Sequence, residues 1–139
     1  MRCVLIVLVF LAVSLGLAVP AVAAPDLTIP SMWLDVGDEE AYPGETIRVF
    51  VNTKNQGTSD IPGLPGFENG VYLSTDATIT TGDTQMLAYW QSGMVAGFTR
   101  GLWEDVTIPA STAPGSYYVG AIADWNNTIA ESSESNNME

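Results

Sequence analysis

After its first 25 residues the sequence is divided into short apolar-rich runs by clusters of Pro, Gly and Asn, and helical periodicity is almost absent. The clearest run is Thr46–Asn55, where Ile47, Val49 and Val51 alternate with residues that are mainly polar. Such alternation turns one face of a strand inward and the other toward solvent. Phe50 lies on the outward face, where we expect a neighbouring loop to cover it. Short strands separated by turn residues are typical of an all-β, two-sheet sandwich.

Seven segments are predicted strands, namely residues 26–36, 46–55, 71–75, 85–91, 99–108, 117–123 and 128–131. Pro30 cannot donate a hydrogen bond to a neighbouring strand, so the first segment is expected at a sheet edge or with a bulge. Residues 57–70 are rich in Pro-Gly turns and are expected to form a long surface loop. The last two segments are predicted to pair as a hairpin, because the Asn126-Asn127 turn between them tolerates positive φ. In 117–123, alternate residues from Tyr117 to Ala123 are expected to face the core.

Residues 114–137 also carry a distinctive order of motifs: Pro114-Gly115, Tyr117-Tyr118, Ala123-Asp124 and an Ala-Glu-Ser-Ser-Glu-Ser-Asn-Asn tail. Four further motifs precede them in order: Pro43-Gly44-Glu45-Thr46, Lys54-Asn55-Gln56-Gly57, Tyr72-Leu73-Ser74-Thr75-Asp76 and Thr107-Ile108-Pro109-Ala110. In this combination the chain resembles the CARDB domain, the cell adhesion related domain found in bacteria. The resemblance implies an immunoglobulin-like sandwich of about seven strands in residues 25–137. It also implies a non-catalytic adhesion or protein-interaction module that acts outside the cell.

The N-terminus has the features of a secretory signal peptide over residues 1–23. Arg2 supplies a positive charge, residues 4–19 form an uncharged apolar run, and Ala21-Val22-Ala23 is a cleavage signature. The alternative is an uncleaved anchor, but a spanning helix needs about 20 apolar residues. Cys3 precedes the apolar run, so the mature chain is expected to hold no cysteine or disulfide, and no membrane insertion is expected after cleavage. We therefore expect a secreted or cell-surface protein.

The charge balance is strongly acidic, with 16 Asp and Glu against 4 Lys and Arg. Loss of Arg2 with the signal peptide changes the net charge from −12 to −13. Such a surface repels phosphate backbones and anionic membranes, which excludes a nucleic-acid partner. Two interpretations of the acids remain open: a solvated, soluble surface, or a set of carboxylates that holds a hard cation.

The residues that most catalytic sites need are missing. The sequence has no histidine, and its one cysteine is Cys3. Ser-His-Asp, Cys-His and His-based zinc sites are therefore excluded. The composition does not exclude a glycoside hydrolase that uses a pair of carboxylates, although nothing in the sequence marks a cleft. We expect a protein that is not an enzyme and that needs no organic cofactor.

Five acidic residues are candidate calcium ligands: Asp76, Asp83, Asp124, Glu131 and Glu134. The first two flank a predicted loop, Asp124 ends one predicted strand, and Glu131 ends its hairpin partner. Calcium takes several carboxylate and carbonyl oxygens, which loops at strand ends can supply. The spacing matches no EF-hand, and ordinary turn acids are the alternative explanation.

The four tryptophans offer a second candidate site. Trp103 is out of phase with Val106 in its predicted strand and Trp125 lies at a predicted hairpin turn, so both are expected to be exposed. Trp33 is a candidate for the buried tryptophan of a sandwich, whereas Trp90 has no clear phase. Exposed tryptophans can stack on sugar rings. The alternative function is therefore a carbohydrate-binding module, with an extracellular polysaccharide as its partner in place of a protein.

Overall fold

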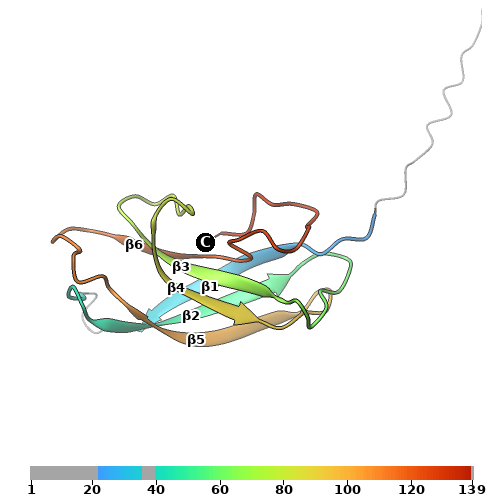
Figure 1. The fold of residues 1–139 in the computed structure, drawn as a ribbon, viewed down its shortest axis with the longest axis horizontal. Coiled ribbons are helices and arrows are strands. Elements are labelled where there is room, and N and C mark those ends of the chain that lie inside the picture. Colours follow the sequence, from blue (N-terminus) through green and yellow to red (C-terminus); the bar gives the residue numbers. More distant parts are fainter. Residues whose placement is uncertain (1–21, 36–39, 139) are drawn as a thin grey trace, which may run out of the picture.

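The computed structural model describes residues 22–35 and 40–138 of the 139-residue chain. The predicted signal peptide therefore falls almost entirely outside the described residues. Within them, six strands follow one another without a helix: β1 (Leu27–Asp35), β2 (Thr46–Asn55), β3 (Phe67–Ser74), β4 (Thr84–Gln91), β5 (Thr99–Thr107) and β6 (Tyr118–Ile122). Figure 1 shows these strands and the loops that connect them.

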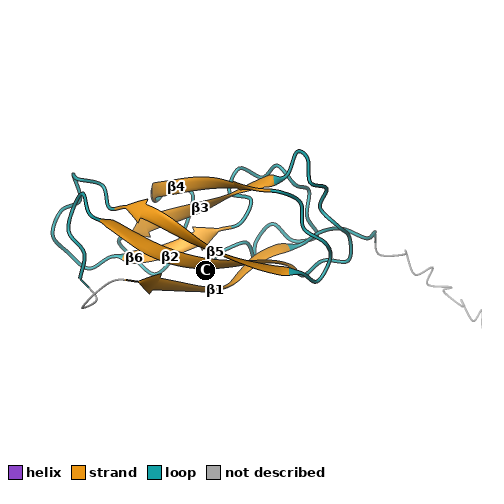
Figure 2. Cartoon of the chain, turned by 90° about the horizontal axis from the view of Figure 1, so that it is seen from below, coloured by secondary structure: helices purple, strands orange, loops and turns teal. Residues whose placement is uncertain are grey.

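The strands form two antiparallel sheets of three strands each, with strand orders β1-β2-β5 and β4-β3-β6. The two sheets pack face to face, and Figure 2 shows β3 and β4 on one side of the molecule and β1 on the other. This confirms the predicted all-β sandwich. Two of the outer strands, β1 and β6, lie at the same side of the sandwich and contact each other.

Sequence patterning located most strands well. β2 has the predicted bounds, and Ile47, Val49 and Val51 are buried as expected. β1 is an edge strand, and its pairing with β2 shifts register between Thr28 and Ser31, on either side of Pro30. The predicted loop over residues 57–70 was too long, because its last four residues begin β3.

The predicted hairpin at the end of the chain was wrong, since residues 128–131 form no strand. Asp124 has a positive φ of 45°, and its carboxylate accepts hydrogen bonds from the backbone N–H groups of Thr128 (3.1 Å) and Ile129 (2.7 Å). These amides are thus satisfied locally instead of by β6. The partner of β6 comes later in the chain: Ala123 N–H donates to Asn137 O (2.7 Å), and Ile122 bridges Met138.

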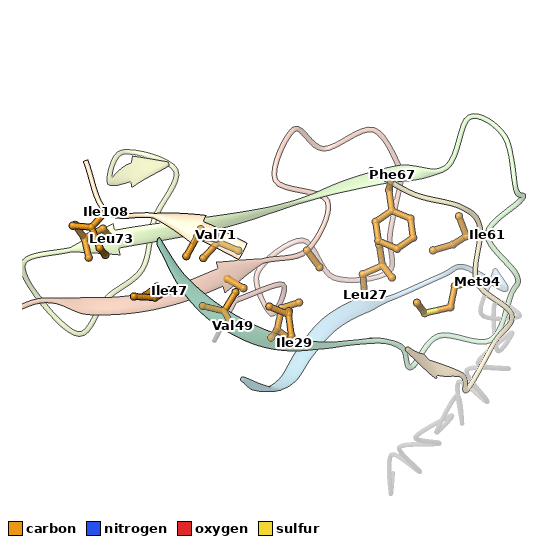
Figure 3. Close-up of a cluster of buried hydrophobic side chains, with 14 residues drawn as sticks. Leu27, Ile29, Ile47, Val49, Ile61, Phe67, Val71, Leu73, Met94 and Ile108 are labelled. Atoms are coloured by element: carbon orange, nitrogen blue, oxygen red, sulfur yellow. The ribbon is translucent and has the colours of Figure 1, made fainter. Parts of the chain in front are cut away.

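The space between the sheets is filled by one large apolar cluster, shown in Figure 3. Inward side chains of β2 meet those of β3, such as Val71, and Ala121 of β6 is fully buried. Tyr117, Val119 and Ala123 also pack on this cluster, as the sequence pattern predicted for that face. Burying one such aliphatic or aromatic side chain contributes about 1.5–3 kcal/mol, so this cluster is the main source of stability.

Asn69 of β3 links the two sheets through buried hydrogen bonds. Its Nδ2 donates to Thr53 Oγ1 of β2 (2.8 Å) and to the Tyr89 hydroxyl of β4 (3.2 Å). Its Oδ1 accepts the backbone N–H of Asp124 (3.3 Å). Asn69 and Thr53 are both fully buried, so no water can replace these bonds. The bonds fix the relative position of the sheets and the start of the turn after β6.

We expect the substitution Asn69→Leu to destabilise the fold by about 1–3 kcal/mol, because it leaves the Asp124 N–H buried without an acceptor. Asn52→Leu is the matched control, since Asn52 is only half-buried and its one side-chain partner is Ser31 (2.9 Å). Urea denaturation measures both. A variant at residue 69 that is as stable as the control would show that the network carries no net stability.

Candidate functional site

Three aromatic side chains form a continuous row across the outward face of the β1-β2-β5 sheet. Trp33 of β1 is paired with Phe50 of β2, and Phe50 is paired with Trp103 of β5. The ring centroids of Trp33 and Phe50 are 5.1 Å apart with an interplanar angle of 38°, and those of Phe50 and Trp103 are 5.0 Å apart at 56°. We call Trp33, Phe50 and Trp103 the aromatic ladder. Cross-strand neighbours on one face of a sheet contact each other in this way.

The two outer members of the ladder are open to solvent. Trp33 is 52% exposed and Trp103 is 49% exposed, whereas Phe50 between them is half-buried. The prediction that Trp103 points away from the core is therefore confirmed. The expected loop cover of Phe50 was wrong, because the flanking tryptophans cover this ring from both sides.

The expectation that Trp33 is buried was wrong, and the bulge in β1 explains why. Leu27, before the register shift, pairs with buried Asn55, so odd-numbered residues there face inward. After the shift, Met32 pairs with inward Val51 and Trp33 pairs with outward Phe50. The bulge thus reverses which residues of β1 face solvent.

Neighbouring residues hold the ladder in place. The guanidinium carbon of Arg48 lies 5.0 Å from the ring centroid of Trp103, a cation–π contact. Arg48 Nε also lies 3.3 Å from Asp105 Oδ1 in an exposed ion pair. Gly101 leaves room for the Phe50 ring, since a Cβ at this position would approach that ring to 2.3 Å. The ladder, Arg48 and Asp105 therefore form one surface with apolar and charged parts.

Trp125 does not join this surface, and its expected exposure was wrong. Its ring is half-buried and packs against Tyr72, Ile79 and Ile122, a small cluster separate from the main core. Its backbone N–H donates to Glu68 O (3.1 Å), which folds the turn after β6 back onto β3. Trp103 lies on the β1-β2-β5 sheet, whereas Trp125 lies in a turn that packs on the other sheet, so the two cannot form a single platform.

Trp90 on β4 is 52% exposed, and its Nε1 donates to Pro65 O (2.9 Å). The position of Trp90 in its predicted strand did not indicate whether the side chain faces the core or solvent. Because Trp90 lies on the other sheet and outside the ladder, it is a natural control position for substitutions of the ladder.

Two of the candidate calcium ligands close turns in the loop after β3. Asp76 Oδ1 accepts the N–H of Thr78 (2.8 Å), and Asp83 Oδ2 accepts the N–H of Thr80 (2.7 Å). The hydrogen bond from the Thr80 backbone, with a smaller contribution from Ser74, lowers the pKa of Asp83. Both carboxylates act as local turn caps, the alternative that the sequence left open.

The other three candidates, Asp124, Glu131 and Glu134, lie at the opposite end of the β4-β3-β6 sheet. Glu131 accepts the backbone N–H of Leu27 at the start of β1 and a bond from Asn137 Nδ2 (2.9 Å). Glu134 Oε1 accepts the N–H of Glu131 (2.9 Å). The five acids therefore split over two ends. Within residues 22–35 and 40–138, no three Asp, Glu, His or Cys side chains are placed to hold a metal ion together.

Burial strongly shifts the acid–base behaviour of this end. The pKa of Glu131 is raised to about 7, mainly by burial and in smaller part by the nearby negative charges of Glu134 and Asp124, while its hydrogen bonds from Leu27 and Asn137 oppose the shift. Burial also raises the pKa of Asp124, although the Ile129 and Thr128 amides oppose the shift. Glu131 therefore binds the C-terminal segment to β1 through a carboxyl group that titrates near neutral pH.

The sequence signature of the CARDB family, matched over residues 24–139, agrees with this architecture. The chain belongs to the CARDB family. Its domains occur in cell-surface proteins and have an immunoglobulin-like sandwich fold. No curated protein matches the chain. No helix in the described part of the chain is long and apolar enough to cross a bilayer.

Solved CARDB domains share the fold at low sequence identity. The crystal structure of the CARDB domain of the PF1109 protein from Pyrococcus furiosus, in complex with di-metal ions, has a TM-score of 0.57 and 22% identity over 83% of each chain. Its solution structure gives 0.54 and 23%, covering 84% of this chain and 90% of that one. A domain assigned to a cell surface protein of Methanosarcina acetivorans gives 0.56 and 17%, covering 84% and 87%.

Sequence reasoning found one of the three ladder residues. Trp103 was identified from its phase, but Trp33 was placed in the core and Phe50 under a loop. Only strand pairing brings the three together, and pairing is not visible in any single strand. The available signal was Pro30, which predicted a bulge but not the change of face that the bulge produces.

The pH dependence of stability should change in the variant Glu131→Gln. The pKa of Glu131 is raised from 4.5 to about 7 on folding. Between these two pH values, the folded chain therefore keeps a proton on Glu131 that the unfolded chain releases. This contribution is fully present below about pH 4.5 and is lost as the pH rises through about 7. Urea midpoints of the wild type should therefore fall relative to those of the variant across this range. Asp105→Asn is the control, and equal pH profiles for the wild type and Glu131→Gln would contradict the assignment.

Proposed function

We propose that this CARDB domain is a secreted or cell-surface, non-catalytic module that binds an extracellular protein through the aromatic ladder. The supporting observation is the exposed pair of tryptophans, Trp33 and Trp103, held in place by Phe50 between them. Large aromatic side chains at the centre of a surface, with a polar rim, are typical of binding hot spots. Arg48 and Asp105 supply the charged rim at the β5 side.

The geometry of the ladder favours a protein over a polysaccharide as the partner. Stacking on consecutive sugar rings needs aromatic faces in one plane, but neighbouring rings of the ladder are tilted by 38° and 56°. Trp125, the second residue expected in a sugar platform, packs on the other sheet. Tilted rings and an arginine suit the irregular surface of a protein, where Trp and Arg contribute most of the binding energy.

The proposal predicts that labelled protein binds the surface of cells and that the double variant Trp33→Ala/Trp103→Ala loses at least tenfold in affinity. Tenfold corresponds to about 1.4 kcal/mol, well within the range of two hot-spot residues. Trp90→Ala is the control and should bind like the wild type. Binding is measured by titrating fluorescent protein onto intact cells of the source organism.

Pretreatment of the cells separates the two candidate partners. Protease treatment should abolish binding if the partner is a protein, whereas periodate oxidation of sugars should leave binding unchanged. The opposite result would show that the same surface binds a polysaccharide, which is the alternative function. Equal binding by the double variant and the wild type would contradict a role for the ladder with either partner.

We also propose that calcium stabilises the domain at its acidic C-terminal end. Asp124, Glu131 and Glu134 repel one another there. The three carboxylates do not converge on one point, but a cation bound beside any of them would reduce that repulsion. The related Pyrococcus furiosus domain was crystallised in complex with di-metal ions, which supports testing this chain.

Millimolar calcium should raise the midpoint of thermal unfolding relative to the chelated protein, and the variant Glu131→Gln should reduce that rise. Magnesium at the same concentration controls for general screening of the acidic surface. An unchanged midpoint in calcium would contradict the proposal.

A further inference from the structure

β6 is an edge strand that is paired along only one of its sides. Residues Tyr118 to Ile122 pair with β3. On its other side, the described residues reach it at one end, where Ala123 N–H donates to Asn137 O and Ile122 bridges Met138. Amides alternate in direction along a strand, so the N–H of Val119 points to the same open side as that of Ala123. It makes no backbone hydrogen bond to the described turns and loops, and by this alternation it also points away from β3.

An apolar groove of about 480 Å³ opens beside this edge. Leu34 and Ile47 line it from one sheet, and Leu73 and Val119 line it from the other. Tyr42 contributes to the same groove and is itself exposed. The groove lies where the end of β1 and the start of β6 leave the sandwich core accessible. It is distinct from the aromatic ladder, which is on the outward face of the other sheet.

The bridge at Met138 shows that the open edge of β6 accepts a segment in the antiparallel direction. Ile122 and Met138 pair antiparallel, so a strand in that direction continues from Ala121 toward Tyr118 and covers the groove. We propose that the open edge of β6 and the groove bind an extended segment of a cationic partner protein as an added antiparallel strand. The main-chain hydrogen bonds supply affinity, and alternate side chains enter the groove.

The distribution of charge favours a cationic segment. Glu40 lines the groove, and Glu45 lies nearby, where its carboxylate accepts the Tyr42 N–H (2.8 Å). Lys54 and Arg100 lie at the other end of their sheet, far from Ile47. Arg48 is adjacent to Ile47 in sequence, but its guanidinium lies on the outward face, over Trp103 and beside Asp105. With a net charge of −12, a second copy of the chain would be repelled, whereas lysine side chains on the added strand would be attracted.

The direct test uses an acetylated, amidated octapeptide of alternating Lys and Val as the probe. We expect saturable binding at submillimolar concentration and at least tenfold slower hydrogen exchange of the Val119 amide, followed by NMR. A peptide with Glu in place of Lys should bind at least tenfold more weakly. Unchanged exchange at millimolar peptide would overturn the proposal, and equal binding of the two peptides would overturn its charge selectivity.

Two variants locate the interaction. Val119→Pro removes the outward N–H without removing a bond to β3 and should abolish peptide binding. Tyr118→Thr is the control, because this neighbouring side chain is 50% exposed, faces away from the groove, and should not affect binding. If Val119→Pro does not fold, the exchange measurement on the wild type still decides the question.

The same experiment distinguishes a partner peptide from a second copy of the chain, and it distinguishes the groove from the aromatic ladder. Slower exchange of Val119 with rising protein concentration and no peptide would show that a second copy occupies the edge, which overturns the proposal of a cationic partner. The Trp33→Ala/Trp103→Ala variant should bind the peptide normally, because the ladder lies on a different face. Loss of peptide binding in that variant would contradict a separate strand-docking site.

Discussion

The rest of the structure depends on the packing of β2 against β3 across the space between the two sheets. Val49 and Val51 are fully buried on one side and Val71 on the other, and Phe67 extends the same cluster. Because side chains of a strand alternate between faces, this packing also determines which side chains face solvent. Phe50 points outward because its neighbours in sequence point inward. The aromatic ladder is therefore a direct consequence of core packing, and it is built across the three strands of one sheet.

The sequence predicted the strands better than the sites, and the difference has a physical basis. A strand's inward face is encoded in its own alternation, so β2 was predicted with its bounds. The direction of Trp33 depends on a bulge three residues earlier, and the burial of Trp125 depends on a contact with β3. The end of the chain was mispredicted because a side chain, Asp124, took the amides that a strand would have used. Tertiary register and side-chain capping are not visible in local periodicity.

The acidic C-terminal tail stabilises the fold through hydrogen bonds, although its carboxylates repel one another. Glu131 joins the tail to the first residue of β1, and Asn137 joins it to the end of β6. Burial, together with the nearby charges of Glu134 and Asp124, raises the pKa of Glu131. This end should thus respond to protons and cations, while the outward face of the β1-β2-β5 sheet stays unchanged. The proposed partner surface and the end that titrates are therefore separate parts of one small domain.

We propose that the aromatic ladder is the surface that meets a partner protein. The most direct measurement places a photo-crosslinking amino acid at the position of Trp103 and, separately, at that of Trp90, and irradiates each protein on intact cells. We expect a crosslinked cell-surface protein from the Trp103 position and none from the Trp90 position. Crosslinking from the Trp90 position alone, or the same product from both, would contradict it.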